Sequence, residues 1–327
     1  MSESFGRGST VRAAASRPTV VGIAVTDLSA AFGALVWVAA VLVAGLGPVE
    51  RALTLAPLVL VPLGVGMAAT PPFGGTAGYA VRAAVWLQPV GAVLFTASLA
   101  RPVGEVTATA LAAPWLLVTG LLGLAAVART RARGGLALPE AAVDAGLAYV
   151  SVGAVALLLY QLDLTFWFGR TIVLLTAVHF HYAGFVLPVL VGLSGRVLSP
   201  LSGAFSSLAG VILVGPAIIA VGISFSPLVE VVAVGGFTVA VALFGGYVLA
   251  RVAPARPRVQ GLLLGASAIA LPASMVLALG YGVATFSGTD LGLDIATMVA
   301  LHGSLNAFGF ALLGLVGWRL AVPAGVA

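Results

Sequence analysis

Three histidines are the residues of this sequence best suited to chemistry, and all of them lie within long apolar stretches. His179 and His181 occur in HFHYAGF, and His302 occurs in HGSLNAFGF. An imidazole can gain or lose a proton near neutral pH, and in its neutral form it is a common metal ligand. Ionisable side chains inside a bilayer are costly and therefore often functional. We treat these three histidines as candidate catalytic or metal-ligating residues.

The spacing of these residues limits what each pair can do. His302 and Asn306 are four residues apart and share a helical face, so Asn306 can hydrogen-bond an imidazole. His179 and His181 are two residues apart, about 200° around a regular helix, and face opposite sides. They cannot both bind one metal ion unless the helix is distorted. The alternative interpretation is structural, since polar contacts between membrane helices contribute only ~0.6 kcal/mol on average.

Further polar residues lie near the same predicted level of the membrane. Tyr182 shares the helical face of His179, and Glu230 is a candidate carboxylate partner for the imidazoles. Asp163 and Arg170 flank the start of the HFHYAGF stretch, where an interfacial ion pair is the structural alternative. Glu230 also has such an alternative, because a carboxylate in the first turn of a helix is favourable. The same account covers Glu140 and Asp144, which begin another apolar stretch.

The composition of the whole chain places these residues in a membrane. Hydrophobic residues make up 61% of the 327 positions and charged residues only 8%, against about 25% charged in soluble domains. The 42 glycines fit helices that pack closely in lipid. Without cysteine, the chain has neither disulfides nor thiolate metal ligands. The arginines form no basic stripe with interleaved aromatic residues, so nucleic acid is excluded as a partner.

The predicted fold class is all-α: a polytopic integral membrane helix bundle of ten transmembrane helices. A helix needs about 20 apolar residues to cross the hydrocarbon core. Glycine and proline clusters separate ten such segments. We expect residues 1–18 to be a disordered cytoplasmic tail and 19–327 a single transmembrane domain. The predicted segments are 28–47, 52–69, 77–100, 106–128, 140–161, 168–193, 204–224, 227–250, 258–281 and 294–320.

The arginine distribution predicts the orientation. With the N-terminus in the cytoplasm, twelve arginines fall inside and three outside, which follows the positive-inside rule. Both termini are then cytoplasmic, and the protein is expected to lie in the cell membrane. His179 and His302 lie about 12–16 Å below the outer edge of their helices, so the polar residues converge in the outer half of the bilayer. The inside set is Arg7, Arg12, Arg17, Arg82, Arg129, Arg131, Arg133, Arg196, Arg251, Arg256, Arg258 and Arg319, and the outside set is Arg51, Arg101 and Arg170.

Two resemblances start from these motifs. TAVHFHYAGFVLPVL at 176–190, followed by LHGSLNAFGF at 301–310, resembles the YndJ-like family of multi-pass membrane proteins. This resemblance covers residues 145–320, and it implies a helical membrane protein without assigning an activity. It singles out His179, His181, Tyr182, Gly184, His302, Gly303 and Asn306. Locally, HFHY is similar to the helix of haem–copper oxidase subunit I whose two histidines bind two haems on opposite faces. The remaining oxidase histidines are missing, so a two-haem oxidase is excluded.

Three functions remain open at this point. The first is an intramembrane enzyme, assisted by a metal ion at His179 and His302 or by acid–base chemistry, that acts on a lipid or another lipophilic small molecule. The second is a redox protein with one bis-histidine haem, bound by His302 with His179 or His181. The third is a proton-coupled transporter that uses the same histidines as a relay.

Overall fold

The computed structural model describes residues 17–198 and 200–325, and it confirms the predicted all-α membrane fold. These residues contain ten helical spans that are long and apolar enough to cross a membrane. Their limits agree with the predicted segments to within a few residues at most ends, and Glu140–Gln161 agrees at both ends. The predicted tail lies outside the described residues except for Arg17 and Pro18. The spans are Val25–Val43, Pro48–Ala68, Gly75–Ser98, Val106–Arg133, Glu140–Gln161, Arg170–Val197, Gly203–Phe225, Pro227–Ala255, Arg258–Ser287 and Ile295–Leu320.

Six of the spans are single α-helices. Proline and glycine mark several span ends. Pro48 and Pro227 lie in the first turns of two spans outside this set of six, where the missing N–H of proline costs no hydrogen bond. Left-handed glycines end two others, at Gly134 and Gly288. The uninterrupted helices are α1 (Val25–Val43), α4 (Gly75–Ser98), α5 (Val106–Arg133), α6 (Glu140–Gln161), α9 (Gly203–Phe225) and α11 (Arg258–Ser287).

The other four spans contain wider π-helical turns, which the sequence did not predict. Such turns are rare and often occur at functional sites. Each histidine motif contains such a turn: one π-helix follows directly after His181, and a different one contains His302. These spans are α2 (Pro48–Leu55), η1 (Ala56–Leu60) and α3 (Val61–Ala68); α7 (Arg170–His181), η2 (Tyr182–Val186) and α8 (Leu187–Val197); α10 (Pro227–Tyr247), η3 (Val248–Val252) and the 3-10 turn η4 (Ala253–Ala255); and α12 (Ile295–Met298), η5 (Val299–Gly303), η6 (Leu305–Leu312) and α13 (Leu313–Leu320).

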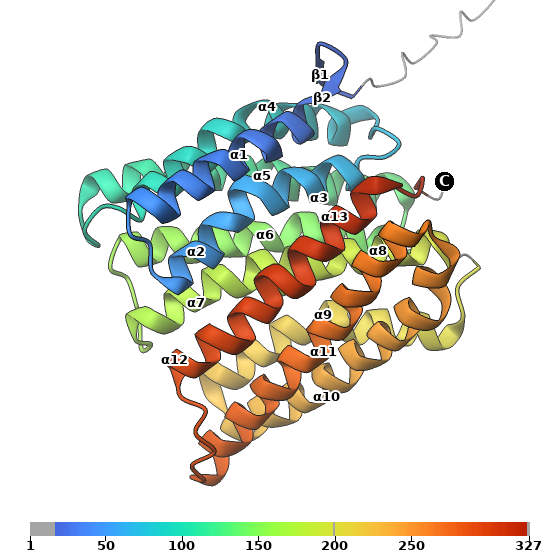
Figure 1. The fold of residues 1–327 in the computed structure, drawn as a ribbon. Helices are drawn as coiled ribbons and strands as arrows, with labels where there is room; N and C mark the ends of the chain where they lie inside the picture. Colours follow the sequence, from blue (N-terminus) through green and yellow to red (C-terminus); the bar gives the residue numbers. More distant parts are fainter. Residues whose placement is uncertain (1–16, 199, 326–327) are drawn as a thin grey trace, which may run out of the picture.

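Most helices pack against their neighbours in the sequence, antiparallel to one another. The series α4, α5, α6, α7 forms one group and the series α9, α10, α11 another. The last span crosses obliquely between them, so that α13 contacts α11, α3 and α8 (Figure 1). This crossing brings the second histidine motif, near the end of the chain, next to the first.

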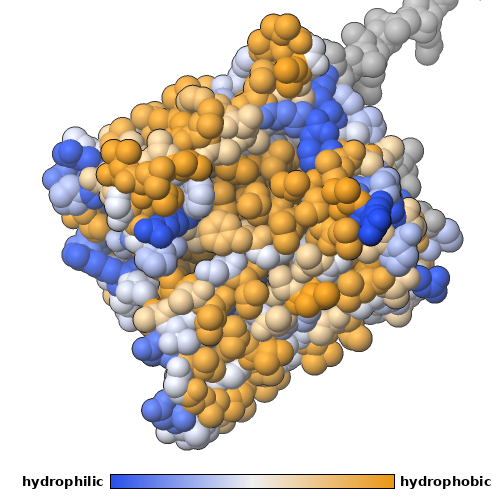
Figure 2. Space-filling view, viewed as in Figure 1, coloured by the Kyte–Doolittle hydropathy of each residue, from blue (hydrophilic) through white to orange (hydrophobic). Residues whose placement is uncertain are grey.

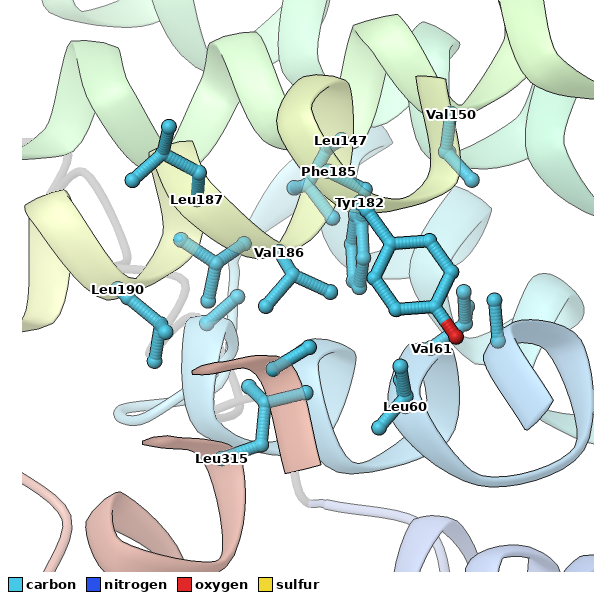
Figure 3. Close-up of a cluster of buried hydrophobic side chains, with 14 of the residues drawn as sticks. Leu60, Val61, Leu147, Val150, Tyr182, Phe185, Val186, Leu187, Leu190 and Leu315 are labelled. Carbon is cyan, nitrogen blue, oxygen red and sulfur yellow. The ribbon is translucent and has the colours of Figure 1, made fainter. Parts of the chain in front are cut away.

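The core extends through most of the bundle, and Figure 3 shows the part of it where the second, fifth, sixth and last spans meet. The second and sixth spans are the most buried of the ten. Gly64 lets them approach, because a Cβ there would lie 2.7 Å from the ring of Phe185. The side chains labelled in this cluster are Leu60, Val61, Leu147, Val150, Tyr182, Phe185, Val186, Leu187, Leu190 and Leu315.

The outer surface is largely apolar, as expected for a protein solvated by lipid. Large hydrophobic side chains such as Leu35, Val90, Val232 and Leu262 are exposed along the spans. Figure 2 shows hydrophobic residues over most of the visible face, with hydrophilic residues concentrated toward the two ends of the bundle. Every backbone polar group that faces lipid must be paired within its helix, which is why the chain crosses as helices.

Most arginines gather at one end of the bundle, which we call the arginine-rich end. The start of α1 and the end of α13 meet there through the ion pair between Arg319 and Asp27. The sequence did not predict a two-stranded hairpin at this end, β1 (Thr19–Val20) with β2 (Ile23–Ala24). That this end faces the cytoplasm stays a prediction. The described arginines of the set are Arg17, Arg82, Arg129, Arg131, Arg133, Arg196, Arg251, Arg256, Arg258 and Arg319.

Candidate functional site

The helix that carries the first motif changes its winding at the motif. Helix α7 ends at His181, and in η2 the N–H of Leu187 reaches back five residues to the carbonyl of Tyr182. Pro188, one residue further on, has no N–H to donate to the preceding turn. The wider turn therefore coincides with the position at which the regular hydrogen-bond ladder is broken.

His181 points into the bundle and is fully buried. Its Nε2 accepts a hydrogen bond from the indole Nε1 of Trp115 at 3.0 Å. Because an indole N–H only donates, this Nε2 is unprotonated, and Nδ1–H donates to the carbonyl oxygen of Ala177 at 2.7 Å. The ring also stacks on Trp115 and meets the edge of Phe95. Both nitrogens of His181 are therefore engaged, which fits a structural role in joining α7 to α5.

His179 faces the opposite side of α7 and is exposed on the surface of the bundle. Its Nδ1 lies 2.7 Å from the carbonyl oxygen of Leu175. A carbonyl oxygen only accepts, so Nδ1 carries the proton and Nε2 carries the lone pair. The centre of its ring lies 6.4 Å from the centre of the His302 ring, with the two planes tilted by 39°.

His302 is held from two sides. Its Nδ1 donates to the carbonyl oxygen of Ser274 on α11, at 2.8 Å. The amide Nδ2 of Asn306 lies 3.2 Å from its Nε2 and 3.0 Å from its backbone carbonyl oxygen. The hydrogen bond expected from the four-residue spacing is thus present. We call His179, His302 and Asn306 the histidine site.

The remaining predicted site residues are not part of this group. The hydroxyl of Tyr182, a buried residue of the core in Figure 3, donates to the carbonyl oxygen of Ala52 at 2.7 Å, joining η2 to α2. Asp163 and Arg170 form a bidentate ion pair with distances of 2.7 and 2.6 Å at the exposed start of α7. Glu230 lies in the first turn of α10, which packs on α9 and α11. Among the described residues, Glu230 forms no ion pair or side-chain hydrogen bond with a histidine.

The ligand set for a metal ion is small. The part of the chain that the structure describes contains no cluster of three or more His, Asp or Glu side chains able to hold a metal ion. A metal at this site would rest on His179 and His302 alone. The Nε2 of His302 is also already occupied by the amide N–H of Asn306.

Comparison with known proteins places the chain in a family. Residues 51–310 match the family model described as YndJ-like protein. The chain belongs to the YndJ-like family. It is also 32% identical over 248 residues to a protein of Bacillus subtilis (strain 168) named uncharacterized membrane protein YndJ, an alignment that covers 73% of this chain and 44% of the relative. The chain therefore spans less than half of that relative's length. No solved structure matches the chain.

The family match includes both histidine motifs and confirms the resemblance that they suggested. The three histidines and Asn306 all lie between residues 51 and 310. The match begins at Arg51, after the whole of α1. This YndJ-like chain is a multi-pass membrane protein, because the matched region comprises most of the ten apolar spans.

A second polar region of the YndJ-like chain lies at the arginine-rich end, and sequence analysis did not predict its pairing. Arg196 is almost completely buried and binds both oxygens of Glu140, at 2.7 and 2.9 Å. It also donates to the carbonyl oxygens of Met67, Ala68 and Thr70 at the end of α3. We call the five ionised residues here the charged network: Arg129, Arg133, Glu140, Asp144 and Arg196.

The charged network joins the ends of several spans. Arg129 pairs with both Glu140 and Asp144, and Arg133 pairs with Asp144 at 2.7 Å. Glu140 and Asp144 were expected to act on their own helix, as carboxylates in its first turn. That expectation did not use the four-residue spacing of the two carboxylates, which puts both on one helical face and is the local signal for a shared set of arginines.

Proposed function

We propose that the histidine site is an intramembrane acid–base site, in which Nε2 of His179 takes up or delivers a proton on a lipophilic substrate. The observation that carries this proposal is the unequal pairing of the ring nitrogens. Five of the six nitrogens on the three histidines have a hydrogen-bond partner. The sixth, Nε2 of His179, has none among the described residues, and its ring is exposed toward the surrounding lipid.

In this proposal, His302 and Asn306 position the reacting group. Ser274 and Asn306 fix the tautomer and the plane of the His302 ring, which then forms one wall beside His179. An unpaired imidazole nitrogen in lipid is costly, which favours a functional over a structural role. His181 is left out because both its nitrogens are engaged. Glu230 is left out because, among the described residues, it forms no ion pair or side-chain hydrogen bond with a histidine.

The substrate is proposed to arrive from the bilayer, because the side of α7 that carries His179 faces lipid. The test is the lipid composition of membranes from cells that express the wild type, His179→Ala or the control Thr176→Val, measured by mass spectrometry. Thr176 lies one turn from His179, and among the described residues its hydroxyl bonds only to the carbonyl of Ile172 on its own helix. Compared with cells that do not express the protein, we expect the amount of at least one lipid species to change when the wild type or Thr176→Val is expressed. We expect no such change with His179→Ala. Identical lipid profiles for the wild type and His179→Ala, at equal amounts of folded protein, would contradict the proposal.

A second measurement checks the site without knowledge of the substrate. Diethyl pyrocarbonate acylates unprotonated imidazole nitrogens that it can reach. We expect the label on His179 and none on His181, whose nitrogens are buried and paired. Labelling of the two histidines at equal rates would mean that their environments do not differ as the hydrogen bonds indicate.

A two-histidine metal or haem site is the second candidate, and one distance favours it. Two imidazoles bound to one metal ion with nitrogen–metal bonds of about 2.0–2.1 Å have ring centres roughly 6 Å apart, and His179 and His302 are 6.4 Å apart. Asn306 must release Nε2 of His302 for such binding. The test is the absorption spectrum of the purified protein, oxidised and then reduced, with metal analysis of the same sample. A Soret band that shifts on reduction and is lost in His302→Ala would favour this candidate. A colourless, metal-free sample would favour acid–base chemistry.

A further inference from the structure

A crevice at the arginine-rich end is separate from the histidine site. It lies among the start of α1, the end of α3 and the first half of α4, is partly open to the surface, and has a cavity volume of about 30 Å³. Its walls are mainly apolar and include Val65, Val81 and Val85. Arg17 and Arg82 are the charged residues of its lining. Figure 2 shows a hydrophilic patch beside the β1–β2 hairpin that adjoins hydrophobic surface.

The crevice continues toward the middle of the membrane. A second, smaller cavity of about 10 Å³ shares Thr26, Val65 and Val85 with the first and is also lined by Gln88. From Arg82 to Gln88 is six residues of helix, or about 9 Å along the axis of α4. Gln88 donates to the carbonyl oxygen of Pro57 at 2.6 Å, while its buried Oε1 has no partner among the described residues. Gln88 is therefore a polar residue in a largely apolar lining, and the lining residues of α4 between Arg82 and Gln88 are apolar.

The two arginines differ from those of the charged network, because neither forms an ion pair with a carboxylate of the described residues. Arg17 donates through one nitrogen, Nη2, to the carbonyl oxygen of Gly66 and to the hydroxyl of Thr70. The guanidinium of Arg82 lies over the ring of Tyr79, 4.7 Å from its centre. Donors on both guanidinium groups thus remain for an anion.

We infer that this crevice binds an anionic phospholipid, with its phosphate between Arg17 and Arg82 and one acyl chain along Val65, Val81 and Val85. Guanidinium groups recognise phosphate oxygens through paired hydrogen bonds. The apolar walls favour a hydrocarbon chain that lies along them, whereas a free, hydrated phosphate gains nothing from apolar contact. The chain's own N-terminal segment suits the crevice poorly, because the residues before Arg17 include Arg7 and Arg12, with Glu3 as the only acidic residue.

The experiment measures which lipids stay bound to the purified full-length protein. The detergent-solubilised protein is equilibrated with equal amounts of phosphatidylglycerol and phosphatidylcholine, and the bound lipid is counted by native mass spectrometry. We expect the wild type to retain phosphatidylglycerol preferentially. Arg17→Gln and Arg82→Gln should each reduce this retention by about tenfold, since each removes charge-assisted hydrogen bonds to the phosphate. The matched control is Arg258→Gln, because Arg258 is exposed at the same end and lies outside the crevice.

Two further arms separate the headgroup from the acyl chain and from the N-terminal segment. Ala69→Leu narrows the crevice without changing its charge and should also reduce retention, whereas added inorganic phosphate should not displace the lipid. Equal retention by the wild type, Arg17→Gln and Arg82→Gln would overturn the inference. An equal loss in Arg258→Gln would do the same, because it would indicate diffuse attraction. Retention that requires deletion of residues 2–15 would overturn it as well, by showing that the N-terminal segment occupies the crevice.

Discussion

The charged network and the histidine site are both polar regions in an apolar bundle, but their groups are paired to very different degrees. In the charged network, Arg196 is 1% exposed at its side chain and binds a carboxylate and three carbonyl oxygens. In the histidine site, His179 is exposed and keeps one nitrogen without a partner among the described residues. Full pairing indicates a structural role, whereas an exposed and incompletely paired group indicates availability for a substrate.

The same difference separates the two histidines of one motif. His181 and His179 are two residues apart, yet one is paired at both nitrogens across the bundle and the other at only one. A histidine in a membrane helix is therefore a functional candidate only after its partners are known. The following predictions test this distinction, beginning with the largest expected effect.

Arg196→Ala should lower the free energy of unfolding by about 3–5 kcal/mol, because it removes one of the two arginine partners of the buried Glu140 and the only one that binds both of its oxygens among the described residues. The measurement is unfolding of the detergent-solubilised protein by titration with a denaturing detergent. Arg101→Ala is the control, since Arg101 and Glu105 are 48% and 41% exposed and such pairs contribute about 0–1 kcal/mol. Similar losses for the two variants would show that the charged network is not the structural element inferred here.

Gly153→Ala should destabilise the protein by about 1–3 kcal/mol through overpacking against His181. A Cβ at this position would lie 2.6 Å from Nδ1 of His181 and 3.1 Å from the carbonyl oxygen of Ala177. Gly120→Ala is the matched control, since a Cβ there meets no atom within 4 Å. The measurement is the same unfolding titration, and equal stability of both variants would show that α6 does not pack on His181 as closely as described.

Trp115→Phe should cost about 1–3 kcal/mol, because the buried Nε2 of His181 then lacks its hydrogen-bond donor. Trp167→Phe changes the same atoms at a side chain that is 66% exposed and should have little effect. Thermal unfolding followed by tryptophan fluorescence compares the two variants with the wild type. A negligible effect of Trp115→Phe would remove the main argument for a structural role of His181.

His179→Ala should change the free energy of unfolding by no more than about 0.5 kcal/mol, as expected for an exposed side chain with one local hydrogen bond. The same unfolding titration measures it, beside His181→Ala as the destabilised comparison. A loss as large as that of His181→Ala would mean that His179 supports the fold, and the distinction between the two histidines would fail.

Much of the fold was predictable because one physical requirement acts along the chain. Residues in lipid must be apolar over about 20 positions, so the spans follow from hydropathy, and Pro227 and Gly288 mark two of their ends. The opposite facing of His179 and His181, and the hydrogen bond between His302 and Asn306, follow from helical periodicity. The π-helical turns were not predicted: Pro188 follows closely after η2, whereas the sequence of η5 and η6 contains no proline that would indicate a break.

The sequence by itself determined the ten spans of this protein, and the tertiary structure decided how its polar side chains are paired. Hydrogen bonds within a helix and transfer into lipid depend on neighbouring residues, so local sequence specifies them. The partner of His181 is 66 residues away on α5, and that of Arg196 is 56 residues away on α6. Which helices become neighbours depends on the packing of all ten spans together. Only that packing separates the buried, fully paired His181 from the exposed His179 two residues before it.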